Sequence, residues 1–331
     1  MSSLTSSLYG IPLKNPLVAG ACSFTARSEK AKELESAGAA AIIVKSLFEE
    51  ELQLEQFKLD ESLEKYDHLY AEMITTHPHL EHAGDLEHIL MVKKIKQSVG
   101  IPVIASLNAV TDKGWIKFAK DLEGAGVDGL ELNFYSLPIK EDVTATEIEQ
   151  KQIDTLSAVK KAVTIPVGVK ISPYYTHLLN FVKKLDDTGA DGITLFNRFF
   201  QPEFDIMSET ESVTFSFSQM GDNLLPLRWT ALLSDRITCP LTTGNGILED
   251  EDLIKALLAG ASSVQVVSTL YKNGIPHMQS MLAGLEKWME LKGYASIEDF
   301  RGRMSKDKQQ DPWAYERVQY IEMLMKKGML F

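Results

Sequence analysis

Four segments of the chain share one pattern, in which a helical stretch ends at a glycine and a short run of small and apolar residues follows. The four copies are ESAGAAAIIV (35–44), EGAGVDGLEL (123–132), DTGADGITLF (187–196) and LAGASSVQVV (258–267). Glycine takes the left-handed conformation that closes a helix without steric cost, so the next strand can begin at once. Repetition of this unit predicts alternating helices and parallel strands joined by right-handed crossovers.

Eight short apolar runs are the candidate strands: 16–21, 40–45, 102–107, 129–134, 166–171, 192–196, 240–244 and 263–267. Such nearly continuous apolar runs are typical of parallel strands covered on both faces. Between them we expect helices, with clear amphipathic stretches at 85–98, 114–125, 149–163, 177–188 and 249–259. Eight strands are enough to close a (β/α)8 barrel of the α/β class, a TIM barrel, and a doubly wound open sheet is the alternative.

Two connections are too long to be plain loops. Residues 46–84 follow the second strand and residues 197–222 follow the sixth, both at the carboxyl ends of strands, where barrel enzymes carry their active sites. Beyond residue 304 the chain becomes charged and helical, which predicts a helix packed on the barrel exterior or a subunit contact. We therefore expect one domain, with the barrel in residues 1–303 and a helical extension in 304–331.

The charge and the cysteine content of the chain indicate which binding partners and which cellular compartment to expect. The net charge of −12 over 331 residues argues against binding nucleic acid or an anionic membrane through a general electrostatic field. The only two cysteines, Cys22 and Cys239, form no CxxC pattern, as expected in a reducing cytoplasm. No apolar run approaches the roughly 18 residues of a membrane span, and the first residues do not resemble a secretory signal. A cytoplasmic protein without a membrane partner is expected.

Glycine-rich loops follow the seventh and eighth candidate strands. They read TTGNGI (242–247) and VVSTLYKNG (266–274). Barrels commonly bind a phosphate between these two loops, through exposed main-chain N–H groups and the start of a short helix. The residues that would supply the site are Gly244, Asn245, Gly246, Ser268 and Thr269. Ordinary turn glycines and a helix cap are the alternative for either loop alone, and other phosphate-binding barrels share the feature.

Two lysines and three asparagines add to the candidate site. Lys45 ends one apolar strand and Lys170 lies inside another, where a lysine is costly unless it is paired. A lysine that reaches solvent at a strand end is the alternative. Asn108, Asn133 and Asn197 lie at or just beyond the carboxyl ends of three strands. Their amides offer donors and acceptors that suit a planar heterocycle.

These features, in their order and spacing, resemble the dihydroorotate dehydrogenase family, particularly its soluble class 1 branch, over residues 7–303. LYGIPLKNPLVAGA (8–21) is similar to the family's barrel-base hairpin and first strand, and GYASIEDFRG (293–302) to its C-terminal part. The resemblance implies FMN as cofactor and a homodimer. It implies that Lys45 and Lys170 contact the flavin, that Lys45 also lies near the substrate, and that Ala21, Ser46 and Gly221 contribute to cofactor binding.

The resemblance also points to the catalytic base. In class 1 enzymes a cysteine stands three residues after the asparagine of the fourth strand, and in class 2 a serine takes this role. Here that position is Ser136, in NFYSLP (133–138). We expect Ser136 to remove a proton while hydride passes to flavin N5, with water or a polar neighbour accepting the proton. A plain loop serine is the alternative.

The expected substrate pocket departs from the family pattern. EMITTHPHLEHAGDLEHIL (72–90) stands where the family has Asn-x-Met-Gly-Leu-Pro-Asn. Arg198 replaces a serine beside Asn197, and Leu137-Pro138 replaces Pro-Asn after Asn133. Substrate recognition is therefore expected to differ while the flavin site is retained. Asn133, Asn197 and Arg198 are the candidate substrate residues, and Arg198 could pair with a carboxylate.

No metal site is expected. The histidines of the altered loop, His77, His79, His82 and His88, follow no zinc spacing and are interpreted as loop residues. No cysteine cluster for an iron–sulfur centre and no GxGxxG motif is present, so electrons are expected from a soluble acceptor, a small donor or a partner subunit.

Three functions remain open on the sequence. The first is an FMN-dependent dehydrogenase or reductase acting on a CH–CH bond of a small planar heterocycle, such as dihydroorotate or a related dihydropyrimidine. The second is a non-redox phosphate-binding barrel, an isomerase or lyase, which would explain the glycine-rich loops but not the two lysines together with the asparagines. The third is a flavin-binding protein without turnover.

Overall fold

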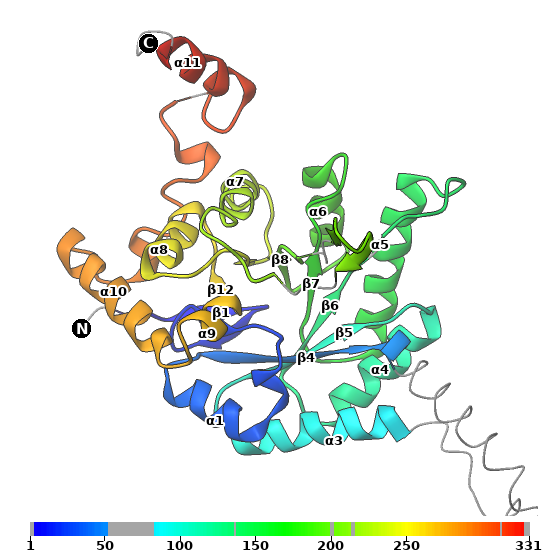
Figure 1. The fold of residues 1–331 in the computed structure, drawn as a ribbon. Helices are drawn as coiled ribbons and strands as arrows, with labels where there is room; N and C mark the ends of the chain where they lie inside the picture. Colours follow the sequence, from blue (N-terminus) through cyan, green and yellow to red (C-terminus); the bar gives the residue numbers. More distant parts are fainter. Residues whose placement is uncertain are drawn as a thin grey trace, which may run out of the picture.

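The computed structural model of the chain describes residues 3–51, 83–135, 137–198, 202–212, 216–311 and 313–327. Eight parallel strands form a closed barrel (Figure 1). In barrel order they are β11 (Leu241–Thr243), β12 (Ser263–Val266), β3 (Leu17–Ala19), β4 (Ala41–Phe48), β5 (Val103–Asn108), β6 (Gly129–Asn133), β7 (Val167–Ile171) and β8 (Gly192–Leu195), with β8 pairing back to β11. The (β/α)8 prediction is confirmed, and closure excludes the open sheet.

Helices surround the strands (Figure 1). They are α1 (Ser28–Ser36), α3 (Ala83–Ser98), α4 (Asp112–Gly124), α5 (Ala145–Ala162), α6 (Leu178–Asp187), α7 (Leu224–Leu233), α8 (Asp250–Ala259), α9 (Ser268–Lys272), α10 (His277–Lys292) and α11 (Arg317–Lys327), with 3-10 turns at Phe24–Ala26, Ile297–Asp299 and Lys306–Lys308. The five helices expected from amphipathic stretches are all present. The repeated glycines take the predicted left-handed conformation, with φ of 101°, 85°, 96° and 115° at Gly38, Gly126, Gly189 and Gly260.

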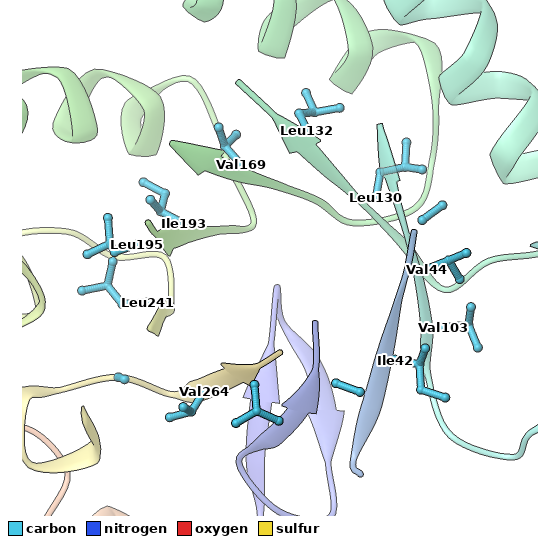
Figure 2. Packing of buried hydrophobic residues seen from close by; sticks show 14 of the residues in the cluster. Ile42, Val44, Val103, Leu130, Leu132, Val169, Ile193, Leu195, Leu241 and Val264 are labelled. Atoms are coloured by element: carbon cyan, nitrogen blue, oxygen red, sulfur yellow. The ribbon is translucent and has the colours of Figure 1, made fainter. Parts of the chain in front are cut away.

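The main core lies between the strands and the helices. Alternate residues of each strand point outward and pack together there, as Figure 2 shows for Ile42 and Val44 of β4, Leu130 and Leu132 of β6, and Val264 of β12. All of these side chains are fully buried. Because side chains alternate along a strand, the residues between them face the barrel interior.

The barrel interior is partly polar, which differs from the expectation of uniformly apolar strands. Its inward-facing polar side chains are Ser106, Glu131, Lys170, Thr194, Thr242, Ser263 and Gln265, and several form hydrogen bonds with one another. The apolar part of the interior gathers around the N-terminal hairpin, where Ile43 and Ile104 contact its residues. The interior therefore has an apolar base and a polar upper layer.

Tyr9 closes the base of the barrel. The hairpin of β1 (Ser6–Leu8) and β2 (Ile11–Leu13) turns at Tyr9 and Gly10, both with positive φ, as in a two-residue hairpin turn. The Tyr9 ring passes beside two glycines of the barrel wall. A Cβ on Gly168 would lie 2.3 Å from the ring, and one on Gly192 would lie 2.6 Å from it. The predicted N-terminal hairpin is confirmed, and glycines at these two positions make room for its tyrosine.

Both long connections begin at the carboxyl ends of strands, as expected. The first starts later than predicted, because β4 runs on to Phe48, and residues 52–82 lie outside the described residues. The second contains a short hairpin of β9 (Glu203–Asp205) and β10 (Thr210–Ser212) that the sequence did not predict.

The C-terminal helix differs from the expectation of a helix packed on the barrel. Helix α11 forms, and apart from Gln319, which lines a cavity with residues of α7 and α8, it extends away from the barrel (Figure 1). Its apolar side chains, among them Ile321, Leu324 and Met325, are exposed. An isolated helix of 11 residues is only marginally stable in water. Of the two roles expected for α11, packing on the barrel or contacting another subunit, the second therefore stays open.

Candidate functional site

A cavity of about 160 Å³ opens at the carboxyl ends of the barrel strands. It brings together residues from separate parts of the sequence: Ala21, Lys170, Asn197, Arg198, Gly244, Asn245, Gly246 and Ser268 from the predicted set, with Gln265 and Ser218 beside them. An adjoining cavity of about 210 Å³ shares Asn197, Arg198 and Asn245. The two predicted loops and one of the two predicted lysines, Lys170, therefore line a single space.

The loop after β11 has the geometry of an anion site. Asn245 and Gly246 are consecutive residues with φ of 64° and 65°. No hydrogen bond of either main-chain N–H occurs within the described part of the chain. The N–H of Gly244 differs, since it donates to the carbonyl of Leu195 at 2.6 Å. Successive main-chain N–H groups in a turn can form a concave site that binds anions.

The side-chain hydroxyls of the loop after β12 form hydrogen bonds within the protein. The Ser268 hydroxyl at the start of α9 accepts from the N–H of Ser218 at 2.9 Å, which holds the loop around residue 218 against the cavity. Thr269 is buried and its hydroxyl donates to the carbonyl of Leu248. Gly221, with φ of 94°, lies nearby in the chain but does not line this cavity.

Lys170 lies at the floor of the cavity. Its side chain is 16% exposed, and its ammonium lies 3.3 Å from Gln265 Oε1 and 3.9 Å from Glu131 Oε1. The expectation of a paired lysine in a buried strand is met at this position. A cation held at this depth can interact strongly with any anionic group in the cavity, since water screens it little.

Lys45 and Ser46 lie where β4 has a bulge. The register between β4 and β5 shifts between Val44 and Leu47. Lys45 is 44% exposed and pairs with Glu51 at 3.0 Å, so the expectation of a buried lysine is wrong here. Ser46 is buried, and its hydroxyl lies 2.7 Å from that of Ser106. Neither residue lines the 160 Å³ cavity.

The asparagines and Arg198 lie along the rim. The amide of Asn197 donates to Asn133 Oδ1 at 2.5 Å, which links the ends of β6 and β8. The Arg198 guanidinium donates to the hydroxyls of two serines and lies 3.4 Å from a carboxylate oxygen of Asp222. Its charge is therefore already partly balanced within the chain.

Asn108 belongs to a different cavity, of about 410 Å³, which it lines with Trp115, Phe134, Tyr135 and Leu137. This cavity lies beside the segment after β6 that carries the expected base. Ser136 itself is outside the described residues, as are His77, His79 and His82. Of the four loop histidines, the structure describes His88 alone.

His88 lies on α3, with its Nε2 atom buried and without a hydrogen-bond partner among the described residues. Burial, and then the positive charge of Lys45, lower its pKa to about 4, although Glu51 acts in the opposite direction. An unfolded histidine has a pKa near 6.5, so between these values only the unfolded state binds the proton. Acid therefore favours unfolding at this position.

We expect the unfolding free energy of the protein to fall between pH 6.5 and pH 4 more steeply than that of His88→Gln. The difference should approach roughly 1 kcal/mol per pH unit, below the limit of 1.4 for one proton. Urea unfolding over this range measures it. The two profiles should run parallel above pH 7, and parallel profiles down to pH 4 would contradict a buried neutral histidine.

No group of three or more metal-ligating side chains occurs within the part of the chain that the structure describes. Among the same residues, no helix combines the length and apolar character needed to cross a membrane.

Beneath the site the structure shows a group of four residues that the sequence reasoning missed. Tyr9, Glu131, Thr194 and Gln265 form a buried hydrogen-bonded group directly below Lys170. A signal for three of them exists in the sequence. LELN (130–133), GITL (192–195) and SVQV (263–266) each place a polar residue between apolar neighbours, which indicates a polar inner face.

Comparison with known proteins agrees with this architecture. A family model described as dihydroorotate dehydrogenase matches residues 82–289. The catalytic subunit of dihydroorotate dehydrogenase B (NAD(+)) from Thermoplasma volcanium is 26% identical over 312 residues, covering 91% of this chain and 98% of that relative. The subunit of the same name from Methanocaldococcus jannaschii is 26% identical over 276 residues, covering 82% and 88%. The family match spans more than half of the chain, and the chain therefore belongs to the dihydroorotate dehydrogenase family.

Proposed function

We propose that this chain is an FMN-dependent oxidoreductase of the EC 1.3 type. It would transfer hydride between flavin N5 and a small planar heterocycle, dihydroorotate or a related dihydropyrimidine. Family membership supports flavin chemistry on such a ring. The observation that carries the proposal is the cavity in which the loops after β11 and β12 meet the buried cation of Lys170.

The residues around this cavity fit the phosphate of FMN. Asn245 and Gly246, whose main-chain N–H groups have no partner among the described residues, line one space together with Ser268 at the start of α9. A Cβ on Gly246 would lie 2.3 Å from the main-chain nitrogen of Asn223, so this turn requires glycine. We infer that these amides, with the main chain of Ser268 and Thr269, hold the phosphate.

Lys170 at the floor and two asparagines at the rim suit the flavin ring. When bound, FMN supplies a hydride acceptor at N5. Lys170 would place its charge beside the ring and favour the anionic reduced form. Asn133 and Asn197 would present their amides to a polar ring edge. By resemblance, we extend the proposal to five further cofactor contacts: Ala21, Lys45, Ser46, Asn108 and Gly221. Gly244, which lines the cavity, is also proposed as a cofactor contact.

Ser136 is the proposed general base, because it stands three residues after Asn133 as the family pattern requires. Lys45 would lie near the substrate, while Asn133, Asn197 and Arg198 would bind it. Since Asp222 pairs with Arg198, a substrate carboxylate would share that cation. The altered loop at 72–90 leaves the substrate proposed as a class of compound.

We propose a homodimer that exchanges electrons with a diffusible acceptor or donor or a partner subunit. The exposed apolar side chains of α11 support a contact between copies, because such a helix gains stability by burying them.

The purified protein should be yellow and should release about one FMN per chain on denaturation. Anaerobic mixing with a panel of dihydropyrimidines should bleach it, since hydride from the substrate reduces the flavin. Absorbance spectroscopy follows both results. A colourless protein that takes up no added FMN would contradict the proposal and favour a non-redox barrel, and FMN that no substrate bleaches would favour a protein without turnover.

A matched glycine pair tests the phosphate loop within the same experiment. Gly246→Ala places a side chain at φ of 65° against Asn223 and should weaken FMN binding roughly 100-fold, the equivalent of two lost hydrogen bonds to a charged group. Gly189→Ala imposes similar backbone strain at φ of 96°, with open space around it and far from the cavity in the fold. It should bind FMN as before.

A further inference from the structure

Glu131 is a fully buried carboxylate at the centre of the barrel. It lies on β6, two residues before Asn133, and is 0% exposed. Its Oε2 atom accepts hydrogen bonds from the Tyr9 hydroxyl and from Gln265 Nε2, both at 2.6 Å. Burying a carboxylate is costly unless donors or a cation compensate it. The N-terminal hairpin and β12 supply these two donors.

The second oxygen of this carboxylate faces the cavity floor. Glu131 Oε1 is buried and has no hydrogen-bond partner among the described residues. The cation near it is the Lys170 ammonium, 3.9 Å away. Lys170 in turn lines the floor of the cavity. Lys170 therefore borders the cavity and also contacts the carboxylate, which does not itself line the cavity.

Gln265 connects the two charged groups. Its Oε1 lies 3.3 Å from the Lys170 ammonium and its Nε2 donates to Glu131. The amide thus presents an acceptor to the cation and a donor to the anion, which fixes its orientation. The Tyr9 hydroxyl stays a donor, because burial and then the charge of Glu131 raise its pKa well above the usual value. The group is arranged around a negative charge on Glu131.

We propose that Glu131 is a positioning residue that holds the Lys170 ammonium at the cavity floor and sets the net charge beneath the cavity. This inference rests on the proposed function in so far as it concerns flavin. Without Glu131 the ammonium loses its anionic partner and moves toward the cavity. The site becomes more positive there, so the anionic reduced flavin is stabilised and the reduction potential rises.

The replacement Glu131→Gln keeps the shape of the side chain and removes its charge. In FMN-loaded protein we expect the equilibrium constant for flavin reduction to rise about tenfold, equivalent to about 30 mV for a two-electron couple. In crystals of the ligand-free variant, the Lys170 ammonium should leave Gln265. Glu131→Asp, which keeps the charge, should restore most of the original potential. A dye-equilibrium titration measures the potential.

Thr194→Val is the matched control. The Thr194 hydroxyl contacts both Tyr9 and Glu131 but carries no charge. This variant should lower thermal stability and leave the potential unchanged. If Thr194→Val shifts the potential as much as Glu131→Gln does, the effect comes from disturbing the hydrogen-bonded group and not from the charge of Glu131. That result would overturn the proposal. An unchanged potential with an unmoved Lys170 in Glu131→Gln would overturn it equally.

The proposal can still be tested if Glu131→Gln does not fold or if the protein takes up no FMN. If Glu131→Gln does not fold, Lys170→Met and Lys170→Met/Glu131→Gln provide the comparison, since removing both charges leaves no unpaired ion. The double variant should have about a tenfold larger reduction constant than Lys170→Met, and equal constants would overturn the charge assignment. If the protein takes up no FMN, the proposed function fails, while the position of Lys170 in ligand-free Glu131→Gln crystals still decides the positioning role.

Discussion

Replacing Ser136 with alanine should slow reduction of the bound flavin by roughly 10²- to 10⁴-fold, the usual contribution of a positioned general base. FMN should remain bound, because the proposed phosphate contacts come from loops after other strands. Rapid mixing of FMN-loaded protein with the dihydropyrimidine that bleaches the unmodified enzyme measures the rate. The dissociation constant for FMN, measured in parallel, separates chemistry from cofactor loss.

Ser136→Cys is the informative companion variant. The class 1 branch carries a cysteine at this position, so a thiol should retain much of the rate that alanine loses. Ser208→Ala, in the exposed turn between β9 and β10, removes a serine that the proposal leaves out of the site and should change nothing. Reduction kinetics that are equal in Ser136→Ala and in the unmodified protein would remove Ser136 from the mechanism.

Gly168→Ala should lower the free energy of unfolding by about 3 kcal/mol, the upper part of the range for overpacking a core. The new methyl group would lie 2.3 to 2.5 Å from three atoms of the Tyr9 ring. The ring cannot move aside easily, because its hydroxyl is bound by Glu131 and Thr194. Chemical denaturation of the two proteins gives the difference.

A second glycine provides the control for Gly168. Gly124 ends α4 at an exposed position, and a Cβ added there would have no other atom within 4 Å. Gly124→Ala should therefore stabilise the protein by up to about 1 kcal/mol. In a Tyr9→Ala background, the cost of Gly168→Ala should largely disappear. If Gly168→Ala behaves like Gly124→Ala, the tyrosine does not fill the barrel base as described.

The fold was largely predictable because its signals are local. The repeated unit spans only ten residues: a glycine ends a helix and an apolar strand follows. All four repeated glycines have the expected conformation. The two loops of the cavity were predictable for the same reason, since strand order places them side by side. The contribution of Tyr9 was not predictable, because its contact with Gly168 depends on a hairpin 159 residues away in the chain.

The two lysines show why burial is harder to predict than placement. Lys45 ends one apolar run and Lys170 lies inside another, yet the first is 44% exposed and the second 16%. A bulge in β4 and the nearby Glu51 account for the first, and the polar interior accounts for the second. Helix α11 likewise has a clear helical sequence, but whether it packs on its own barrel depends on surfaces that no local pattern describes.

The hydrogen-bonded group around Glu131 and Lys170 lies below the rim, and its members come from β6, β7, β8, β12 and the N-terminal hairpin. None of them belongs to the segments that depart from the family pattern. Loops of a barrel can be exchanged without rebuilding the strands that carry them. Evolution can thus change the substrate of such a chain through its loops. The charges around the Lys170 ammonium, which the strands carry, then stay the same.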